Sequence, residues 1–115
     1  HEVDAKLKPF PSAEPGISGL DTLLALALRL VDEGVLPIGE LIARLTSNPA
    51  TILGLPGGKI GVGEVADLII VDLETHWICE PARFISKGKN SPFGGWDFNG
   101  SVTHTLIDGK VVYQA

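Results

Sequence analysis

The segment 20–33 constrains this chain more than any other, because it predicts a helix without a polar face. Asp21, followed by Thr22, can cap its start, and Gly34 follows its acidic end as a left-handed stop. Helices that are apolar all round are buried inside a larger assembly rather than lying on a surface. The apolar positions are Leu23, Leu24, Leu26, Ala27, Leu28, Leu30 and Val31. The sequence therefore predicts a chain that packs within something larger than itself.

The other segments place helices first and strands last. Residues 1–19 are predicted to be loop, because prolines and glycines interrupt any regular period. Helices are predicted at 39–47 and 49–54, the latter closed by Gly54. A glycine-rich turn with a short strand inside it is predicted at 57–63, and a loop at 81–100. Strands are predicted at 66–72, 75–80, 101–107 and 110–114.

Two details of the predicted strands carry more weight than the rest. The β-branched run in 66–72 indicates a strand buried on both faces. Asp108-Gly109 separates the last two strands and is typical of a two-residue hairpin turn, in which both central residues have positive φ.

Composition excludes several classes of protein. The chain has 115 residues, too few for a complete (β/α)₈ barrel of roughly 200 residues or more. Its formal net charge of −5 argues against nucleic acid as a partner. No apolar run reaches the roughly 18 residues of a membrane span. The single cysteine, Cys79, excludes an internal disulfide and suits a reducing compartment, so we expect a cytoplasmic protein. Because the sequence begins at His1 and lacks methionine, we expect a processed or excised piece.

The side chains that could carry chemistry form no complete catalytic set. The segment 57–63 lacks the Gly-Lys-Ser/Thr order of a phosphate loop. The histidines His1, His76 and His104 lie far apart, and no second ligand stands near any of them at metal-binding spacing. Cys79 has no neighbouring base, so a buried structural thiol is predicted. The basic residues within 83–89 indicate a structured surface loop rather than a nucleic-acid site.

Six stretches of the chain, taken in order, carry a family pattern. They are His1–Phe10, Ala13–Asp21, Leu45–Leu55, Gly58–Asp72, Ser86–Phe93 and Gly109–Tyr113. In the family pattern, an Asp-His-x-Pro-His motif is followed by a Lys and then by a Pro-Phe pair. The first stretch has the same spacing, with His1 at the second His of the motif, Lys6 at the Lys and Pro9-Phe10 at the pair. Together they resemble the dihydroorotase family, which are cyclic amidohydrolases of the amidohydrolase superfamily. The Lys-Asn-Ser-Pro-Phe segment at 89–93 and the Pro-Gly-Ile loop at 15–17 are the most specific parts of the resemblance.

The resemblance implies an α/β fragment from the C-terminal end of a larger enzyme. Residues 1–56 would form the loop over the mouth of a metal-dependent (β/α)₈ barrel and its closing helices. Residues 57–115 would form the C-terminal part of a small composite β-sandwich, whose other strands come from the enzyme's N-terminus. The upstream part of the same protein would therefore be the first partner of this chain.

The resemblance also implies a reaction, the reversible hydrolysis of dihydroorotate to N-carbamoyl-L-aspartate in pyrimidine synthesis. Zinc would activate the water and a carboxylate would move the proton. The metal ligands and that carboxylate lie upstream in the family, so this chain would hold no catalytic and no metal-binding residue and would be inactive alone.

Three residues inherit a substrate-binding role by matching the family's motifs. His1 matches the histidine that contacts the substrate carboxylate, and Gly16 the position whose backbone approaches the substrate ring. Pro15 beside it offers a carbonyl and no N–H. Asp4 and Lys6, with Phe10, would be loop scaffolding.

Two other readings stay open on the sequence. The first is a non-catalytic dihydroorotase-like scaffold subunit of aspartate transcarbamoylase. The second is a related cyclic amidohydrolase, an allantoinase or hydantoinase. A homo-oligomer fits either reading. If the chain stands alone, Leu23, Leu26 and Leu30 would form an exposed apolar patch and drive self-association.

Overall fold

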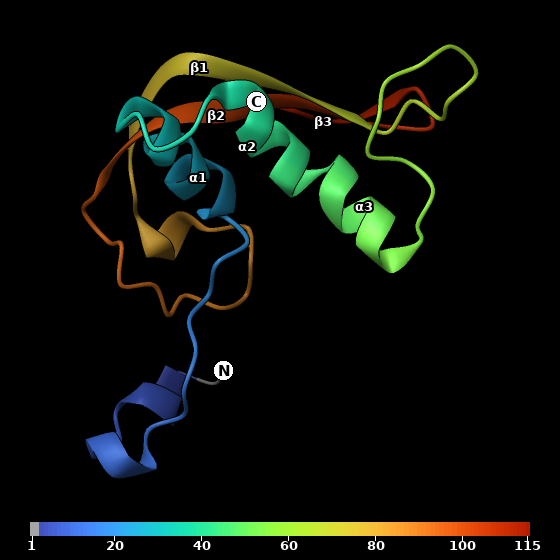
Figure 1. Ribbon diagram of the computed structural model, residues 1–115. Coiled ribbons are helices and arrows are strands. Elements are labelled where there is room, and N and C mark those ends of the chain that lie inside the picture. Colours follow the sequence, from blue (N-terminus) through green and yellow to red (C-terminus); the bar gives the residue numbers. More distant parts are fainter. Residues whose placement is uncertain (1–2) are drawn as a thin grey trace.

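The computed structural model describes residues 3–115. Two 3₁₀ turns, η1 (Val3–Lys6) and η2 (Phe10–Ser12), precede the helices α1 (Leu23–Asp32), α2 (Ile38–Leu45) and α3 (Ser47–Leu53). The second half holds β1 (Leu68–Ile78), the 3₁₀ turn η3 (Pro81–Arg83), β2 (Asp97–Ile107) and β3 (Lys110–Gln114). In Figure 1 the helices run along one side of the sheet, and the first turns, in dark blue, extend away from both. The predicted order of helices before strands is confirmed.

The sheet has the order β1-β2-β3, and both neighbouring pairs are antiparallel. β1 joins the two strands predicted at 66–72 and 75–80 into one, with a register shift between Asp72 and His76. At this irregularity the Asp72 carboxylate accepts hydrogen bonds from the Glu74 N–H at 2.9 Å and the Thr75 hydroxyl at 2.8 Å. These hydrogen bonds, that of Glu74 first, hold the pKa of Asp72 below its ordinary value. A bulge, not a strand end, therefore interrupts the apolar pattern.

The hairpin between β2 and β3 forms as predicted. Asp108 and Gly109 have φ of 49° and 73°, so both central residues of the turn are in the left-handed region. The turn is tied to the start of β1, because the Asp108 N–H donates to the Asp67 carboxylate at 2.8 Å. β2 begins at Asp97, inside the predicted loop, because its first residues pair with the end of β1.

α1 confirms the predicted helix and its predicted end. The Gly34 N–H donates to the Val31 carbonyl and the Val35 N–H to the Leu30 carbonyl, both at 2.9 Å or less. This pair of bonds is a Schellman motif, with Gly34 at φ 70°. The predicted start is different: the N-cap residue is Thr22, and no side chain caps the helix. Asp21 bonds elsewhere, as described below.

α1 is buried on one face only. Ala25 and Leu28 are buried in the packing of α1 against β2, and Leu26 is partly buried. Leu23 is 55% exposed and Leu30 is 40% exposed. The predicted apolar patch therefore keeps Leu23 and Leu30, while Leu26 contributes to the core.

The hydrophobic core is small and lies between α1, the start of β2 and the loop that joins β1 to β2. The Trp77 and Phe98 rings pack with centroids 5.1 Å apart and planes tilted by 50°, and the Trp77 indole N–H donates to the Gly100 carbonyl at 2.9 Å. The core consists of Ala25, Cys79, Phe84 and Phe98, with Leu26, Trp77 and Phe93 packed against it. α3, by contrast, contains no buried residue.

Two local predictions are wrong. The segment 57–63 contains no strand and forms bends and turns, with the Glu64 N–H donating to the Gly61 carbonyl and Lys59 paired with Glu64. The run 66–72 is not buried on both faces, since Ile69 and Ile70 are each more than half exposed. Among the described residues, pairing with β2 thus leaves Ile69 and Ile70 more than half exposed.

The chain exposes more surface than a compact domain of its size. Its accessible area is 8484 Å², whereas a compact chain of 12.1 kDa exposes about 6,000 Å². Its radius of gyration is 16.5 Å, against about 13 Å for a compact chain of this length. No helix in the described residues is long and apolar enough to cross a lipid bilayer.

Candidate functional site

The loop around Pro15 and Gly16 is the predicted site that the structure describes, since His1 lies outside the described residues. Both residues are exposed. Two donors share the Gly16 carbonyl: Lys6 Nζ at 2.9 Å and Asn90 Nδ2 at 3.0 Å. The loop is thus held by its own N-terminal turn and by a segment from the β half.

η1 supports the loop from one side. The Lys6 ammonium also donates to the Glu14 carbonyl, and the Glu14 N–H donates to the carbonyl of the buried Ala5 at 3.2 Å. Lys6 therefore bridges the two residues on either side of Pro15. This agrees with its predicted role as loop scaffolding.

The segment 84–91 supports the loop from the other side. The Ser18 N–H donates to the Asn90 backbone carbonyl at 2.7 Å. A Cβ on Gly88 would stand 2.4 Å from the Ser18 hydroxyl oxygen, so the two segments are in close contact. The Lys89 ammonium donates to the carbonyl of the buried Phe84. The predicted structured loop is confirmed, with Lys89 contributing to its closure.

Asp21 makes a third link between the same two segments. Its carboxylate accepts a hydrogen bond from the Ile85 N–H at 2.9 Å, although the two residues are 64 positions apart. Partial burial raises the pKa of Asp21, but hydrogen bonds from Ser86 and Ile85 outweigh this effect and leave the pKa below its ordinary value. Asp21 thus stays ionised at neutral pH and anchors the loop.

His76, His104 and Cys79 lie where packed or surface residues were predicted. His76 is exposed, and the half-buried His104 contacts the Thr103 hydroxyl at 3.0 Å through Nδ1. Cys79 is 1% exposed, and its burial, with a further contribution from the Asp21 carboxylate, raises the pKa of the thiol. Among residues 3–115, no group of three or more His, Cys, Asp or Glu side chains could hold a metal ion.

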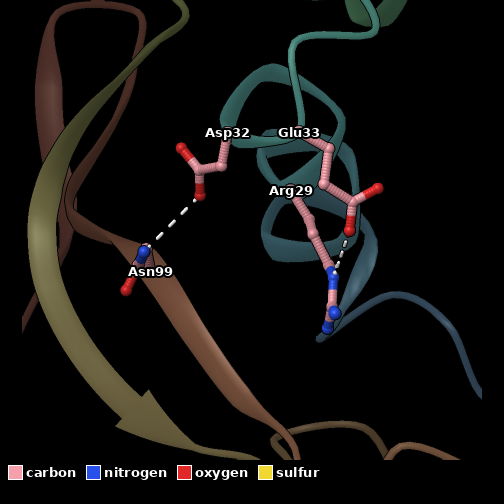
Figure 2. A network of polar contacts seen from close by, with 4 residues as sticks. All are labelled: Arg29, Asp32, Glu33 and Asn99. Carbon is pink, nitrogen blue, oxygen red and sulfur yellow. Dashed lines mark hydrogen bonds and ion pairs between the residues drawn. The ribbon is translucent and has the colours of Figure 1, made fainter.

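A polar network beside the core joins α1 to β2. Figure 2 shows Arg29 Nε donating to the Glu33 carboxylate at 2.9 Å, and Asn99 facing Asp32 at 3.5 Å. The Arg29 guanidinium also lies 4.9 Å from the centre of the Trp96 ring. These residues border a surface cavity of about 360 Å³. The network contains no nucleophile with an adjacent base, so we interpret it as a structural connection.

Reasoning from the sequence missed Asn90 as a site residue. It lies in the Lys-Asn-Ser-Pro-Phe segment, which the resemblance marks as specific without giving it a role. The signal was therefore present, but its meaning depends on a contact across 74 positions of the chain.

Comparison with known proteins identifies the family. The model of the amidohydrolase family matches residues 15–112. The chain is 43% identical over 114 residues to a dihydroorotase of Syntrophus aciditrophicus, and 45% identical over 115 residues to one of Geobacter sp. strain M21. It is 45% identical over 114 residues to a dihydroorotase-like protein of Pseudomonas aeruginosa. These matches cover 99% or more of this chain and 27% of each relative's length.

Solved structures agree with the family. The L-hydantoinase of Arthrobacter aurescens superposes with a TM-score of 0.83 at 33% identity, over 90% of this chain and 24% of its own. The D-hydantoinase of a Thermus species superposes with a TM-score of 0.87 over 96% of this chain and 26% of its own; at 23% identity this likeness concerns the fold. The chain therefore belongs to the amidohydrolase family. Its particular relatives are dihydroorotases, of whose length it spans about a quarter.

Proposed function

We propose that this chain is the C-terminal part of a dihydroorotase, which hydrolyses dihydroorotate reversibly to N-carbamoyl-L-aspartate in the cytoplasm. The observation that carries the proposal is the identity of 43–45% with dihydroorotases along practically the whole chain. The sequence motifs that first indicated this family lie along that same length. On this proposal the isolated chain is inactive, because the catalytic carboxylate lies in the remainder of the protein.

The fold divides under this proposal into two parts. Residues 1–56 cover the mouth of a (β/α)₈ barrel and close it with helices, and residues 57–115 form part of a small β-sandwich. The large accessible surface supports this arrangement, because it exceeds that of a compact chain by roughly 2,500 Å². The upstream part of the protein would cover the exposed side of α1 and the exposed residues of β1.

The substrate-binding residues proposed in this chain are His1, Pro15 and Gly16. The Gly16 carbonyl is already occupied by Lys6 and Asn90. Within residues 3–115, the Gly16 N–H and the Pro15 carbonyl have no hydrogen-bond partner. The Gly16 N–H is therefore free to donate to a ligand and the Pro15 carbonyl is free to accept from one, and the two point in opposite directions because the peptide between them is trans. The absence of a Cβ on Gly16 allows a close approach.

Zinc belongs to the proposal for the complete protein, where it would activate a water molecule. The described residues of this chain do not fit a metal site, since no three potential ligands converge among them. We therefore assign the zinc ligands to the remainder of the protein. No residue of this chain is given a role in the chemistry that zinc performs.

The test is an assay of the complete protein that contains this sequence. Purified protein with bound metal should open the ring of dihydroorotate, with uptake of one water, and close the ring of N-carbamoyl-L-aspartate, with release of one water. A metal-loaded protein that turns over neither compound contradicts the proposal. The 115-residue chain, prepared in parallel, should show no turnover.

A scaffold function is the second candidate, and the name of the Pseudomonas aeruginosa relative, a dihydroorotase-like protein, favours it. On this reading the complete protein assembles with aspartate transcarbamoylase and has neither zinc nor turnover. Size-exclusion chromatography of the two proteins together separates the readings, because a scaffold shifts the transferase to a larger species.

A different cyclic amide is the third candidate, favoured by the likeness to L-hydantoinase at 33% identity. Hydantoins, allantoin and dihydroorotate have different rings, but each ring contains a cyclic amide. The same backbone groups of Pro15 and Gly16 can therefore hydrogen-bond to any of them. A panel of the three substrates decides, and the largest kcat/KM names the activity.

A further inference from the structure

The Gly16–Ser18 turn is hydrogen-bonded at both ends to one residue that is distant in the sequence, Asn90. Asn90 donates from its side chain to the Gly16 carbonyl at 3.0 Å, and its own backbone carbonyl accepts the Ser18 N–H at 2.7 Å. One residue thus provides both a donor and an acceptor across the turn. Lys6 of η1 adds a second donor to the Gly16 carbonyl.

Asn90 is itself held in place by the core. Next to it, the Lys89 ammonium donates to the carbonyl of Phe84, which belongs to the buried cluster. On the other side of Asn90, the Ser91 N–H donates to the Lys89 carbonyl at 3.0 Å. The Asn90 side chain is therefore short and attached to a backbone segment that hydrogen bonds hold in place. Lys6, in contrast, reaches the same carbonyl with a long and flexible side chain.

Gly16 needs such a restraint. Its φ of 95° lies in a region that glycine adopts freely, and glycine has the largest choice of backbone conformations to lose. Backbone groups that bind a ligand must be kept close to their productive geometry by the residues behind them. Hydrogen bonds to the Gly16 carbonyl fix the orientation of the peptide that follows Gly16.

We propose that Asn90 is a positioning residue, which holds the Pro15–Gly16 backbone in the conformation that binds substrate. This inference rests on the proposed function for the role of Pro15 and Gly16. Asn90 does not touch substrate and acts through Gly16. It links the β half of the chain to the substrate loop of the first half, so that the loop's geometry depends on residues from both.

The decisive variant is Asn90→Asp in the complete protein. It keeps the size of the side chain and the backbone carbonyl that binds Ser18, but removes both amide donors and places a carboxylate oxygen against the Gly16 carbonyl. We expect KM for dihydroorotate to rise about 10-fold, the loss typical of one hydrogen bond, with kcat changed less than about 3-fold. Gln114→Glu is the matched control, because it makes the same chemical change at an exposed site on β3 and should leave both constants unaltered.

Amide hydrogen exchange on the same proteins provides the second readout. The Ser18 amide should exchange at least 10-fold faster in Asn90→Asp than in Gln114→Glu. The Cys79 amide, which donates to the Trp96 carbonyl inside the core, should exchange equally in both. A merely structural role for Asn90 would accelerate Cys79 as well, and that result would overturn the proposal.

The kinetic results separate failure of the positioning role from failure of the proposed function. If Asn90→Asp and Gln114→Glu share the same KM, the positioning role is overturned. If the unaltered protein hydrolyses none of the cyclic amides, the proposed function fails, and Ser18 exchange alone decides whether Asn90 holds the turn.

Lys6→Met, with Lys8→Met as its control, should raise KM less than Asn90→Asp does. The double variant should raise it more than either single change, because two donors share one acceptor.

Discussion

Because Gly100 of β2 has no side chain, Leu28 of α1 can pack directly against the strand at this position. A Cβ on Gly100 would lie 2.4 Å from Leu28 Cδ1, and Gly100 has a φ of 84°. The helix thus approaches the strand at a position where only glycine combines the necessary room with the necessary backbone conformation. This contact seats α1 on the sheet and connects the helical half to the β half.

Gly100→Ala should therefore destabilise the protein by about 2–4 kcal/mol, from strained backbone and overpacking combined. Urea unfolding followed by tryptophan fluorescence measures the loss. Gly39→Ala is the control, because a Cβ there meets nothing within 4 Å and φ is not positive. In the double variant Leu28→Ala/Gly100→Ala the two losses should be less than additive, and full additivity would show that the contact with Leu28 does not matter.

Asp21 should make the stability depend on pH in the acid range. Because folding lowers its pKa from 3.8, the carboxylate stabilises the fold above about pH 4, and this contribution is lost as the pH falls through the lower folded value. Asp21→Asn should destabilise the protein by about 1 kcal/mol at pH 7 and should differ less from the unaltered protein at pH 3. Thermal unfolding at both pH values measures this, and a difference that grows toward low pH would contradict the assignment.

The 115-residue chain prepared alone should self-associate. Leu23 is 55% and Leu30 40% exposed on the outer side of α1, and the chain exposes far more surface than a compact domain. Multi-angle light scattering at increasing concentration should show a mass above 12.1 kDa. Replacing Leu23 and Leu30 by glutamine should lower that mass, and a monomer at all concentrations would refute the expectation.

Cys79 should be inert in the folded protein. It is 1% exposed and its thiol has a raised pKa, so the reactive thiolate is scarce near neutral pH. Labelling with a thiol reagent such as Ellman's reagent should be at least 100-fold slower in buffer than in denaturant. Equal rates in the two conditions would place Cys79 at the surface.

The sequence predicted those elements whose signals are local. The ends of the helices at Gly34 and Gly54 and the turn at Asp108-Gly109 depend on single residues and their neighbours, and the structure confirms each of them. The bulge in β1 could not be predicted, because it requires β2 as a partner. The strand expected within 57–63 was wrong for the same reason, since pairing rather than propensity decides a short strand.

The candidate site divides in the same way. Pro15 and Gly16 came from a family motif that is contiguous in sequence, whereas nothing near Asp21 indicates that its carboxylate binds Ile85 instead of capping α1. Asn90 lies 74 positions from the carbonyl that it binds. Long-range pairings of this kind depend on the folded core, which a local pattern does not encode.

The same separation sets an order of events during synthesis. Chains emerge from the ribosome N-terminus first, so the Pro15–Gly16 loop leaves it many residues before Asn90 has been made. Until the segment around Asn90 has followed, the loop lacks the hydrogen bonds that Asn90 makes with Gly16 and Ser18. Within this chain, the loop can therefore reach its final shape only after residues 74 positions behind it have been made.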